Sequence, residues 1–531
     1  MTLAQTDLAV WPTAVNAALL GIDRAGLTLP SGEGSLGSAC TQLAGVETDP
    51  SAALLHVAAA ASVYRRCGSI PVRTDEARSA ACPPDARVMC PPAAAGLLRR
   101  ILQGEHASLV GEWLTLAARQ FMRVPADTLP ELLDRALRDS RLRSPVITVA
   151  GTRATWLAGH NPDWSFAIAG ASADALAELW EQSADGRTRL AALQQLRVLD
   201  PERARSALEK SWAEESPAER AAFVGALVHG LSPADEPFLE RALDDRRKEV
   251  RQNAAALLAR LPASALVARM AARAKALVSL GRSGLLKRLR VDVTLPAAAD
   301  DALVRDGVDA KPPVGIGERA WWLAQILAAV PPSTWTLSGS VDAKAVLGAV
   351  DGHEWREPLV AGWLIATERH RDATWAEALW AHDRVARIDP KWGAPQLERV
   401  FTTIVPADRV DAELRKSIGA GRDVLRGNHP VLSAILAWPN EWSDPLARSV
   451  AYRIKEYASE RVPLTSEYGV RALLERSGHA VPISATGAFI DDWPEQDSDA
   501  WRTWAPAIDA LASVLRFRND LHLAFNEAPA T

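Results

Sequence analysis

Apolar positions recur at helical spacing through much of the chain, most clearly between residues 187 and 275. Asp244 and Asp245 precede one such stripe, where their carboxylates can accept hydrogen bonds from the first amides of a helix. Pro262 follows the stripe and cannot continue a helix. This spacing predicts an amphipathic helix that buries one face. The apolar residues of the stripe lie at i, i+4, i+7, i+8 and i+11: Val250, Ala254, Leu257, Leu258 and Leu261.

Three short triplets mark an internal repeat. Ala-Ala-Leu or Ala-Ala-Phe occurs at 191–193, 221–223 and 255–257, at intervals of 30 and 34 residues. Periods of this length are typical of helix-pair repeats, whose pairs bury their apolar faces only by stacking on neighbours. The pattern therefore predicts an all-α fold with an α-solenoid in the middle. The alternative is an ordinary helical domain in which the spacing is a coincidence.

Prolines, glycines and tryptophans divide the chain into four expected regions. Residues 1–150 form a helical N-terminal region, and residues 151–295 form the repeat region. Residues 296–317 hold three prolines and three glycines, which indicates a hinge or linker. Residues 318–531 hold 13 of the 19 tryptophans, which usually anchor helix packing, although some can instead face a partner. The last amphipathic stretch, 509–525, is expected to dock on this Trp-rich C-terminal region.

Charge and cysteine content narrow the classes of function. The 531 residues carry a net charge of −5, so no global basic field attracts nucleic acid. The sparse cysteines form no C-x-x-C pair, which is typical of reduced thiols in a reducing compartment; zinc ligation by three of them with His56 is the weaker alternative. Without a signal peptide or a long apolar run, a cytoplasmic protein is expected. The four cysteines are Cys40, Cys67, Cys82 and Cys90.

Two groups of charged residues are candidates for a partner surface. The first group lies around the second repeat helix, where repeat-to-repeat pairing and helix capping are the alternative roles. The second group belongs to the run Arg269–Arg290, which contains no acid and predicts a basic helix face for phosphates or an acidic partner. A solvated face, or pairing with the acidic stretch around Asp300 and Asp301, is its alternative. The candidates are Asp244, Arg247, Lys248, Arg251, Arg273, Arg282, Lys287 and Arg288.

A cluster of polar and aromatic residues near position 160 is a candidate pocket. The alternative is a helix end, stopped at Gly159 and followed by a turn. The cluster consists of Trp156, His160, Asn161 and Asp163.

Motifs of nucleotide binding and hydrolysis are missing from the sequence. It contains no G-x-x-x-x-G-K-[ST] phosphate loop, no H-E-x-x-H zinc helix and no G-x-S-x-G nucleophile turn. No catalytic, cofactor-binding or metal-binding residue is therefore predicted.

Five strings occur in order through most of the chain: WPTAVNAALLGIDR, RATWLAGHNPDW, LSPADEPFLERALDDRRKEVRQNAAALLARLPASALVARM, KPPVGIGERAWWLAQIL and RIDPKWGAPQLERV. Together they resemble an uncharacterised bacterial family, the domain of unknown function 5691, and the last hundred residues match it less clearly. The resemblance implies a bacterial cytoplasmic helical protein, with HEAT-like repeats in the middle. It also implies that the gene lies beside genes for a MoxR-type AAA+ ATPase, a von Willebrand A-domain protein and a SWIM zinc-finger protein, which makes these proteins candidate partners.

Three functions follow as hypotheses. A non-catalytic protein-interaction scaffold needs only stacked helices and exposed side chains, and it is the one that we favour. A nucleic-acid-binding solenoid is the alternative, supported by the basic run and opposed by the acidic net charge. An enzyme that acts at the cluster near His160 is the second alternative.

Overall fold

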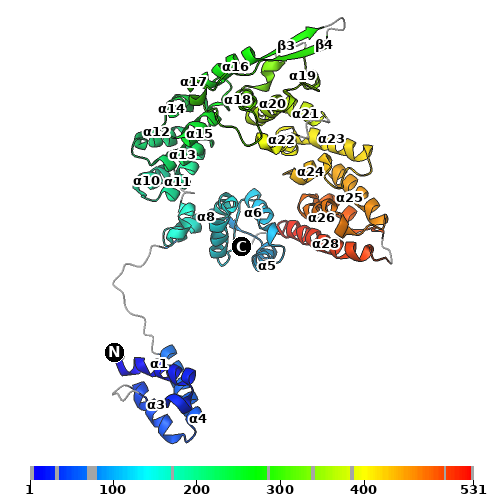
Figure 1. Ribbon diagram of the computed structural model, residues 1–531. Helices are drawn as coiled ribbons and strands as arrows, with labels where there is room; N and C mark the ends of the chain where they lie inside the picture. Colours follow the sequence, from blue (N-terminus) through cyan, green and yellow to red (C-terminus); the bar gives the residue numbers. More distant parts are fainter. Residues whose placement is uncertain are drawn as a thin grey trace. The chain divides into compact units, whose positions relative to one another are not determined.

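The computed structural model describes residues 5–29, 35–67, 81–168, 173–283, 288–336, 341–382, 388–494 and 498–527. The described residues are mainly α-helical, which confirms the all-α prediction, and the strands among them form two small two-stranded sheets. None of the helices described has the length and apolarity needed to cross a membrane. The chain forms two compact units, residues 1–81 and 82–531 (Figure 1). The division falls inside the range 1–150 that we expected to be a single region.

The first unit is a small helical bundle. Its core joins Val10 and Ala14 of the first helix to Leu36 and Cys40 of the third and to Val57 of the fourth. The four helices are α1 (Gln5–Leu20), α2 (Ile22–Ala25), α3 (Ser35–Val46) and α4 (Pro50–Cys67).

The second unit begins with a block of short elements, residues 82–168, that has its own core. Strands β1 (Val88–Met89) and β2 (Met122–Arg123) pair in parallel. Around them lie α5 (Pro92–Leu102), α6 (Val110–Arg119), α7 (Leu129–Arg138), α8 (Arg143–Ala158) and α9 (Ser165–Ile168).

Gly151 divides helix α8 into two parts. Its φ of 70° lies in the left-handed region, and a Cβ at this position would lie 1.6 Å from Oδ2 of Asp85. The same carboxylate oxygen accepts a hydrogen bond of 2.9 Å from the amide of Thr152. Only glycine permits this approach, because any side chain would displace Asp85.

The remaining helices pack in pairs along the chain. Helices α11, α13, α15, α16, α18, α20, α22, α24, α26 and α28 contact one another in succession, and shorter helices lie beside them (Figure 1). One hydrophobic core runs through this array from Leu176 to Leu515. The first part of the array contains α10 (Ala173–Gln182), α11 (Gly186–Leu199), α12 (Pro201–Ser211), α13 (Pro217–Ala226), α14 (Glu236–Ala242), α15 (Lys248–Leu258) and α16 (Ala265–Leu277).

The second part of the array follows the antiparallel strands β3 (Val278–Ser283) and β4 (Arg288–Val293) and the short helix α17 (Asp301–Arg305). It contains α18 (Glu318–Ala328), α19 (Ala343–Ala349), α20 (Arg356–His370), α21 (Ala373–Trp380), α22 (Leu397–Ile404), α23 (Ala407–Ala420), α24 (Pro430–Ala437), α25 (Asp444–Ser459), α26 (Tyr468–Ala480), α27 (Thr486–Ile490) and α28 (Trp501–Ala524).

Local sequence signals explain where the early array helices begin. Asp185, Asp200 and Ser264 each accept a backbone hydrogen bond from the first turn of α11, α12 and α16. Ser216 and Glu219 form a reciprocal capping box at the start of α13. These side chains satisfy amides that have no partner within the helix.

A buried ion pair joins successive pairs of this array. Arg197 of α11 and Asp235, which precedes α14, are both completely buried and lie 2.8 Å apart. The guanidinium also donates to the backbone oxygens of Pro201, Leu227, His229 and Gly230. With every donor directed to an acceptor, the charge is compensated without water.

Other arginines link the end of one helix to the next helix pair. Arg369 donates to the carbonyl of Ala328 at 3.0 Å, Arg453 to that of Ile418 at 2.8 Å, and Arg518 to that of Val481 at 2.6 Å. Carbonyls at a helix C-terminus lack a partner within the helix and carry partial negative charge, so they suit a cation. Each contact therefore holds two stacked pairs in register.

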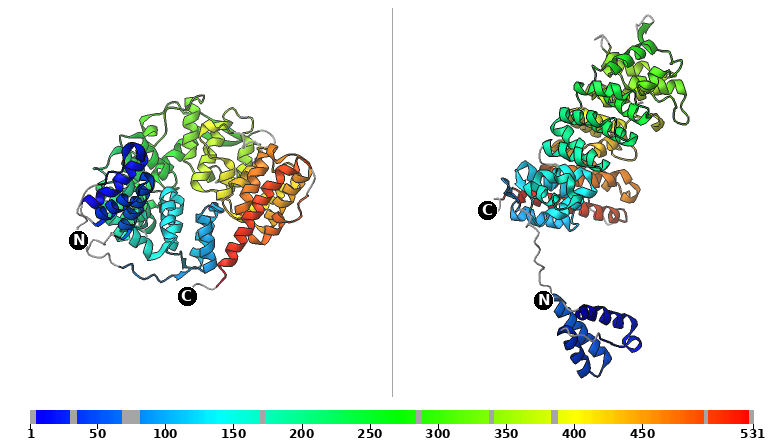
Figure 2. Two further views of the ribbon diagram at one scale, coloured as in Figure 1. Left: turned by 90° about the horizontal axis from the view of Figure 1, so that it is seen from below. Right: turned by 90° about the vertical axis from the view of Figure 1, so that its left-hand side faces the viewer.

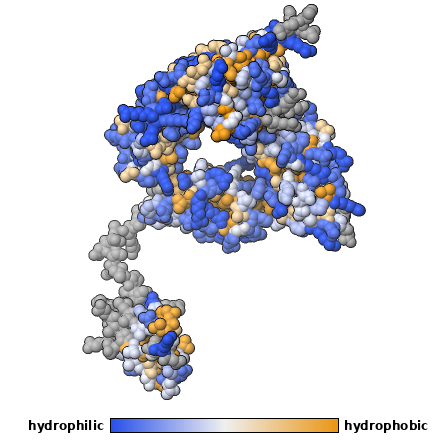
Figure 3. Space-filling view, viewed as in Figure 1, coloured by the Kyte–Doolittle hydropathy of each residue, from blue (hydrophilic) through white to orange (hydrophobic). Residues whose placement is uncertain are grey.

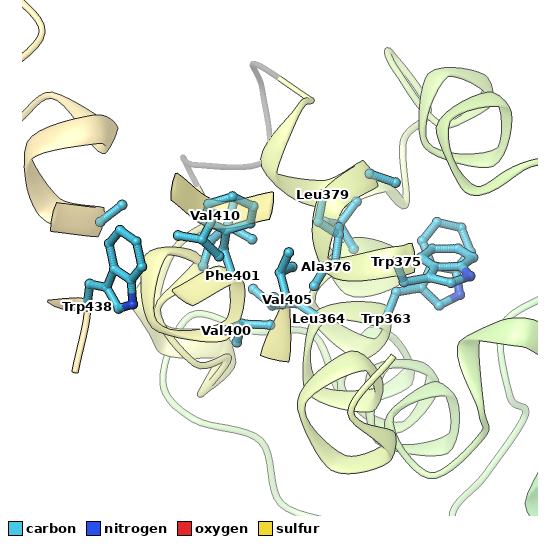
Figure 4. Packing of buried hydrophobic residues seen from close by; sticks show 14 of the residues in the cluster. Trp363, Leu364, Trp375, Ala376, Leu379, Val400, Phe401, Val405, Val410 and Trp438 are labelled. Carbon is cyan, nitrogen blue, oxygen red and sulfur yellow. The ribbon is translucent and has the colours of Figure 1, made fainter. Parts of the chain in front are cut away.

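The tryptophans of the C-terminal half are core residues, as expected. All 13 are buried or half-buried. Trp335, Trp363 and Trp375 form one cluster, with ring centroids 6.2 and 5.4 Å apart; Figure 4 shows Trp363 and Trp375 packed together. Their large apolar area stabilises the contact between α20 and α21.

Helix α28 packs on the 82–168 block as well as on α26. Phe517, Leu521 and Phe525 are buried in the core of the block, where Phe525 meets the ring of Trp113 edge-on at 5.2 Å. The expectation that this helix docks on the Trp-rich C-terminal region was therefore incomplete. The contact closes the second unit into a ring: in Figure 2 the red last helix lies beside the blue helices of the block, and the space-filling view shows an opening inside the ring (Figure 3).

Charged groups reinforce this closure, which joins residues 406 positions apart. Arg518 lies 2.7 Å from Glu112, and His522 lies 2.8 Å from the same carboxylate. Burial favours the neutral form of Glu112, but hydrogen bonds from His522 and Arg518 outweigh it and hold the pKa of Glu112 below its ordinary value.

We expect Arg518→Ala to lower the free energy of unfolding by about 3–5 kcal/mol, because it leaves buried polar partners uncompensated. Arg516→Ala, two residues away on the exposed side of α28, is the matched control and should change it by less than about 0.5 kcal/mol. Denaturant unfolding of both variants measures the difference. Equal effects would contradict the role given to Arg518.

We also expect a pH dependence of stability from His370. Burial, assisted by nearby Arg369, lowers the pKa of His370 to about 4, whereas an unfolded histidine has a pKa of about 6.5. Between these values the unfolded chain binds more protons, so stability falls as the pH falls from 6.5 to 4. Melting temperatures across this range should fall less steeply for His370→Phe, and His160→Phe should leave the slope unchanged.

Candidate functional site

The β3–β4 hairpin presents a basic face to solvent. Because side chains alternate along a strand, Leu280 and Val291 face the core of the array while Arg288 and Arg290 point the other way. Arg290 lies opposite Gly281, so no cross-strand side chain covers it. It pairs with Asp292 at 2.7 Å, and Arg288 is exposed beside it. Anions can therefore approach this face directly.

The expected basic helix is divided between two structures, so this prediction was wrong. Helix α16 ends at Leu277 and Val278 adopts an extended backbone, with φ −129° and ψ 122°. Arg282 and Arg288 consequently lie on the exposed hairpin, and Lys287 lies outside the described residues. A β-branched residue followed by alternating polar and apolar positions is the signal of a strand that we overlooked.

The helical half of the basic run is neutralised within the fold. Arg269 and Arg273 lie 2.7 and 2.5 Å from Asp306, which is buried. Burial opposes charge on Asp306, but hydrogen bonds from these two arginines hold its pKa below the ordinary value. The run therefore pairs with the acidic stretch around Asp300 and Asp301, as expected, but through Asp306, while Asp300 accepts from the amide of Leu303 and caps α17. The segment 296–317 is tied to α16 by these ion pairs.

The four candidates at the second repeat helix mainly make contacts within the fold. Asp244 receives two hydrogen bonds from Arg305, of 2.6 and 3.1 Å, which lower its pKa. Lys248 lies 2.8 Å from Asp309, and Arg251 donates to the carbonyl of Asp245. The remaining candidate, Arg247, precedes α15 and is exposed.

The residues near His160 form a helix end and a turn. Helix α8 stops at Ala158, and the amide of Asp163 donates to the side chain of Asn161 at 3.1 Å. The rings of Trp156 and His160 meet edge-on at 4.7 Å. His160 and Asp163 are exposed, so their side chains do not converge on an enclosed space.

A groove of about 490 Å³ lies between helices α8 and α11. Its apolar lining includes Ile147, Val198 and Leu199, and the last two are 68% and 57% exposed. The rest of its lining is mostly polar: Ser140, Arg143, Ser144, Thr148, Gln194, Gln195 and His229. The groove was not predicted from the sequence, where only the triplet at 191–193 marked this helix. Val198 and Leu199 lie off the buried face of α11, and large apolar residues in such positions were the available signal.

Among the residues that the structure describes, no group of three or more His, Cys, Asp or Glu side chains is placed to hold a metal ion. Cys40 and Cys90 are buried, and burial raises the pKa of Cys90 to about 11. The side chain of Cys67 lies outside the described residues.

These features define an all-α protein whose helices pack in succession along the chain and which exposes apolar and basic side chains. The chain belongs to a family of unknown function, DUF5691, whose family model matches residues 13–525. No curated protein and no solved structure matches the chain.

We expect the hairpin to bind polyanions through Arg288 and Arg290. The double variant Arg288→Glu/Arg290→Glu should elute from a heparin column at lower salt than the wild type. Binding releases counterions from the polyanion, and a protein with fewer cations at the contact releases fewer of them. Lys311→Glu is the control, since it makes the same kind of change at an exposed position outside the hairpin. Lys311→Glu changes the charge half as much as the double variant, so a shift half as large for it would show a dependence on net charge alone.

Proposed function

We propose that the protein is a non-catalytic scaffold, an α-solenoid of HEAT-like helix pairs that binds protein partners. The observation that carries this proposal is the single core that runs through the stacked helices from Leu176 to Leu515. Such an array holds its shape through contacts between neighbours and offers a long exposed surface, which suits binding more than chemistry. The buried ion pair of Arg197 and Asp235 adds rigidity to this surface.

The groove between α8 and α11 is the binding surface that the geometry supports best. Val198 and Leu199 are large apolar side chains with more than half of their surface in water. Transfer of such side chains into an interface is favourable by about 25 cal/mol per Å² of apolar surface. The groove can receive an apolar segment of a partner, and the polar groups of its lining can fix the orientation of that segment.

The partners that we propose are a MoxR-type AAA+ ATPase, a von Willebrand A-domain protein and a SWIM zinc-finger protein. This choice of partners rests on the family resemblance. The proposed location of the protein is the bacterial cytoplasm. In this scheme the scaffold brings the ATPase together with a second protein and makes no covalent change itself.

The test is to titrate each purified candidate partner into the protein and measure heat by calorimetry. One partner should bind, and Leu199→Asp should weaken binding at least about tenfold, or roughly 1.4 kcal/mol, because a carboxylate enters an apolar contact. Val314→Asp is the matched control, since Val314 is also exposed but lies outside the groove. Failure of all three partners, together with no specific capture from the native lysate, would contradict the scaffold.

Nucleic-acid binding is a second candidate because the hairpin exposes Arg288 and Arg290 on one face. Titration of the same protein with duplex and single-stranded DNA at low salt distinguishes nucleic-acid binding from the scaffold function. Binding that falls steeply with salt and is lost in Arg288→Glu/Arg290→Glu would favour nucleic acid. Binding of a protein partner that persists in this variant favours the scaffold.

A further inference from the structure

The contact that closes the second unit can separate without disturbing the core of the array. We call this contact, between the second half of α28 and the 82–168 block, the seam. It joins side chains that lie 406 positions apart in the sequence. Among the described residues, the core of the array contains none from the block, which has a core of its own. Release of α28 from the block would therefore open the ring and leave the stacked helices folded.

Ionisable side chains are concentrated at the seam. Glu112 of α6 lies 2.7 Å from Arg518 and 2.8 Å from His522, both of α28. Arg518 also lies 3.4 Å from Glu441, which precedes α25. Its own side chain is only 2% exposed, so these charges interact with little screening by water. The strength of the seam therefore depends on the protonation of its acids and histidines.

A second histidine of the block contacts α28 beside this network. The ring of His106 lies 3.1 Å from the hydroxyl of Ser513 and meets the ring of Phe517 edge-on at 5.0 Å. The guanidinium of Arg100 lies over the same phenyl ring at 4.9 Å and pairs with Glu105. These contacts place further positive charge around the buried end of α28.

His479 of α26 is half-buried at the seam, where charges from three other elements reach it. Burial and the positive charge of Arg518 hold the pKa of His479 below its ordinary value of 6.5. Arg476 and His106 act in the same direction, and the opposing charge of Glu112 is outweighed. His479 is therefore neutral in the closed ring at neutral pH.

Opening of the seam takes up protons at two groups. Once water reaches His479, its pKa returns to the ordinary value of 6.5, so below that pH the open ring holds one proton more than the closed ring. Hydrogen bonds from His522 and Arg518 hold the pKa of Glu112 below 4.5 only while the seam is closed. Both groups act with the same sign, and acid favours the open ring.

We propose that the seam is an acid-sensitive latch, in which protonation of His479 and then of Glu112 releases the second half of α28 from the block. A protonated His479 faces the cations of Arg518 and Arg476, and a protonated Glu112 no longer forms an ion pair with Arg518. The open ring exposes Phe517, which is buried when the seam is closed. The latch uses no residue of the α8–α11 groove or the β3–β4 hairpin, so it is independent of the proposed scaffold function.

The experiment measures the width of the seam in the full chain by double electron–electron resonance. Spin labels are introduced as noncanonical residues at Thr115 of α6 and Arg516 of α28, which are both exposed. The wild type should show one short distance near neutral pH and a second, longer distance in acid. The ratio of long to short should rise by up to about tenfold per pH unit below about 6.5, the limit for uptake of one proton.

Two variants assign the response to its groups. His479→Gln cannot take up the first proton, so its ratio should stay nearly constant until the pH approaches about 4.5. Glu112→Gln removes the partner of Arg518 and should raise the ratio near neutral pH at least about tenfold. His160→Gln is the matched control, since His160 belongs to the same block but packs on Trp156, and it should respond as the wild type does.

A second label pair separates opening from unfolding. Labels at Glu178 of α10 and Glu209 of α12 are exposed positions on two helices that contact each other within the array. Their distance should not change while the seam opens. A seam that stays short in acid would overturn the proposal, as would lengthening of both pairs at the same pH. A response that His479→Gln and Glu112→Gln both retain unchanged would overturn it as well.

Discussion

The second unit depends on the contact between its last helix and its first block. Phe517, Leu521 and Phe525 of α28 are buried among residues of the 82–168 block. An array of stacked helices leaves an apolar face open at its terminal pair, and that face must be covered for the array to remain soluble. Here the cover comes from a part of the chain that precedes the array. The closure joins Arg518 to Glu112, 406 positions away, and its cost in chain entropy grows only slowly with that separation.

Arginine side chains connect successive helices along the array. Arg369, Arg453 and Arg518 each donate to the carbonyl at or near the end of a preceding helix. Arg197 goes further and binds a buried carboxylate and four carbonyls at once. A planar guanidinium with five donors can satisfy several acceptors that diverge from one point, which an ammonium group cannot do. Exposed ion pairs of the surface contribute far less.

The surfaces that remain after these contacts form are the places where the protein can act. The groove of Val198 and Leu199 and the hairpin of Arg288 and Arg290 both lie on the second unit. They differ in chemistry, since the hairpin exposes arginines and the groove combines exposed apolar side chains with polar ones. A scaffold with several surfaces of different chemistry can hold different molecules at the same time.

The sequence by itself determined most of the helices and much of the core. It did not determine every cap, because Asp244, which was expected to cap the helix of the Val250 stripe, pairs with Arg305, and α15 begins without a side-chain cap. The spacing of Val250, Ala254 and Leu257 identified a buried stripe, and Ser216 with Glu219 carried a cap, because these signals act within a few residues. The tertiary structure alone decided which charged side chains are neutralised by ion pairs within the fold. Arg273 and Arg288 belong to one basic run, yet only Arg288 is exposed, because Asp306 approaches Arg273 from 33 positions away. The closure by α28, the division after residue 81 and the groove at Leu199 arise in the same way, from contacts between segments that no local pattern connects.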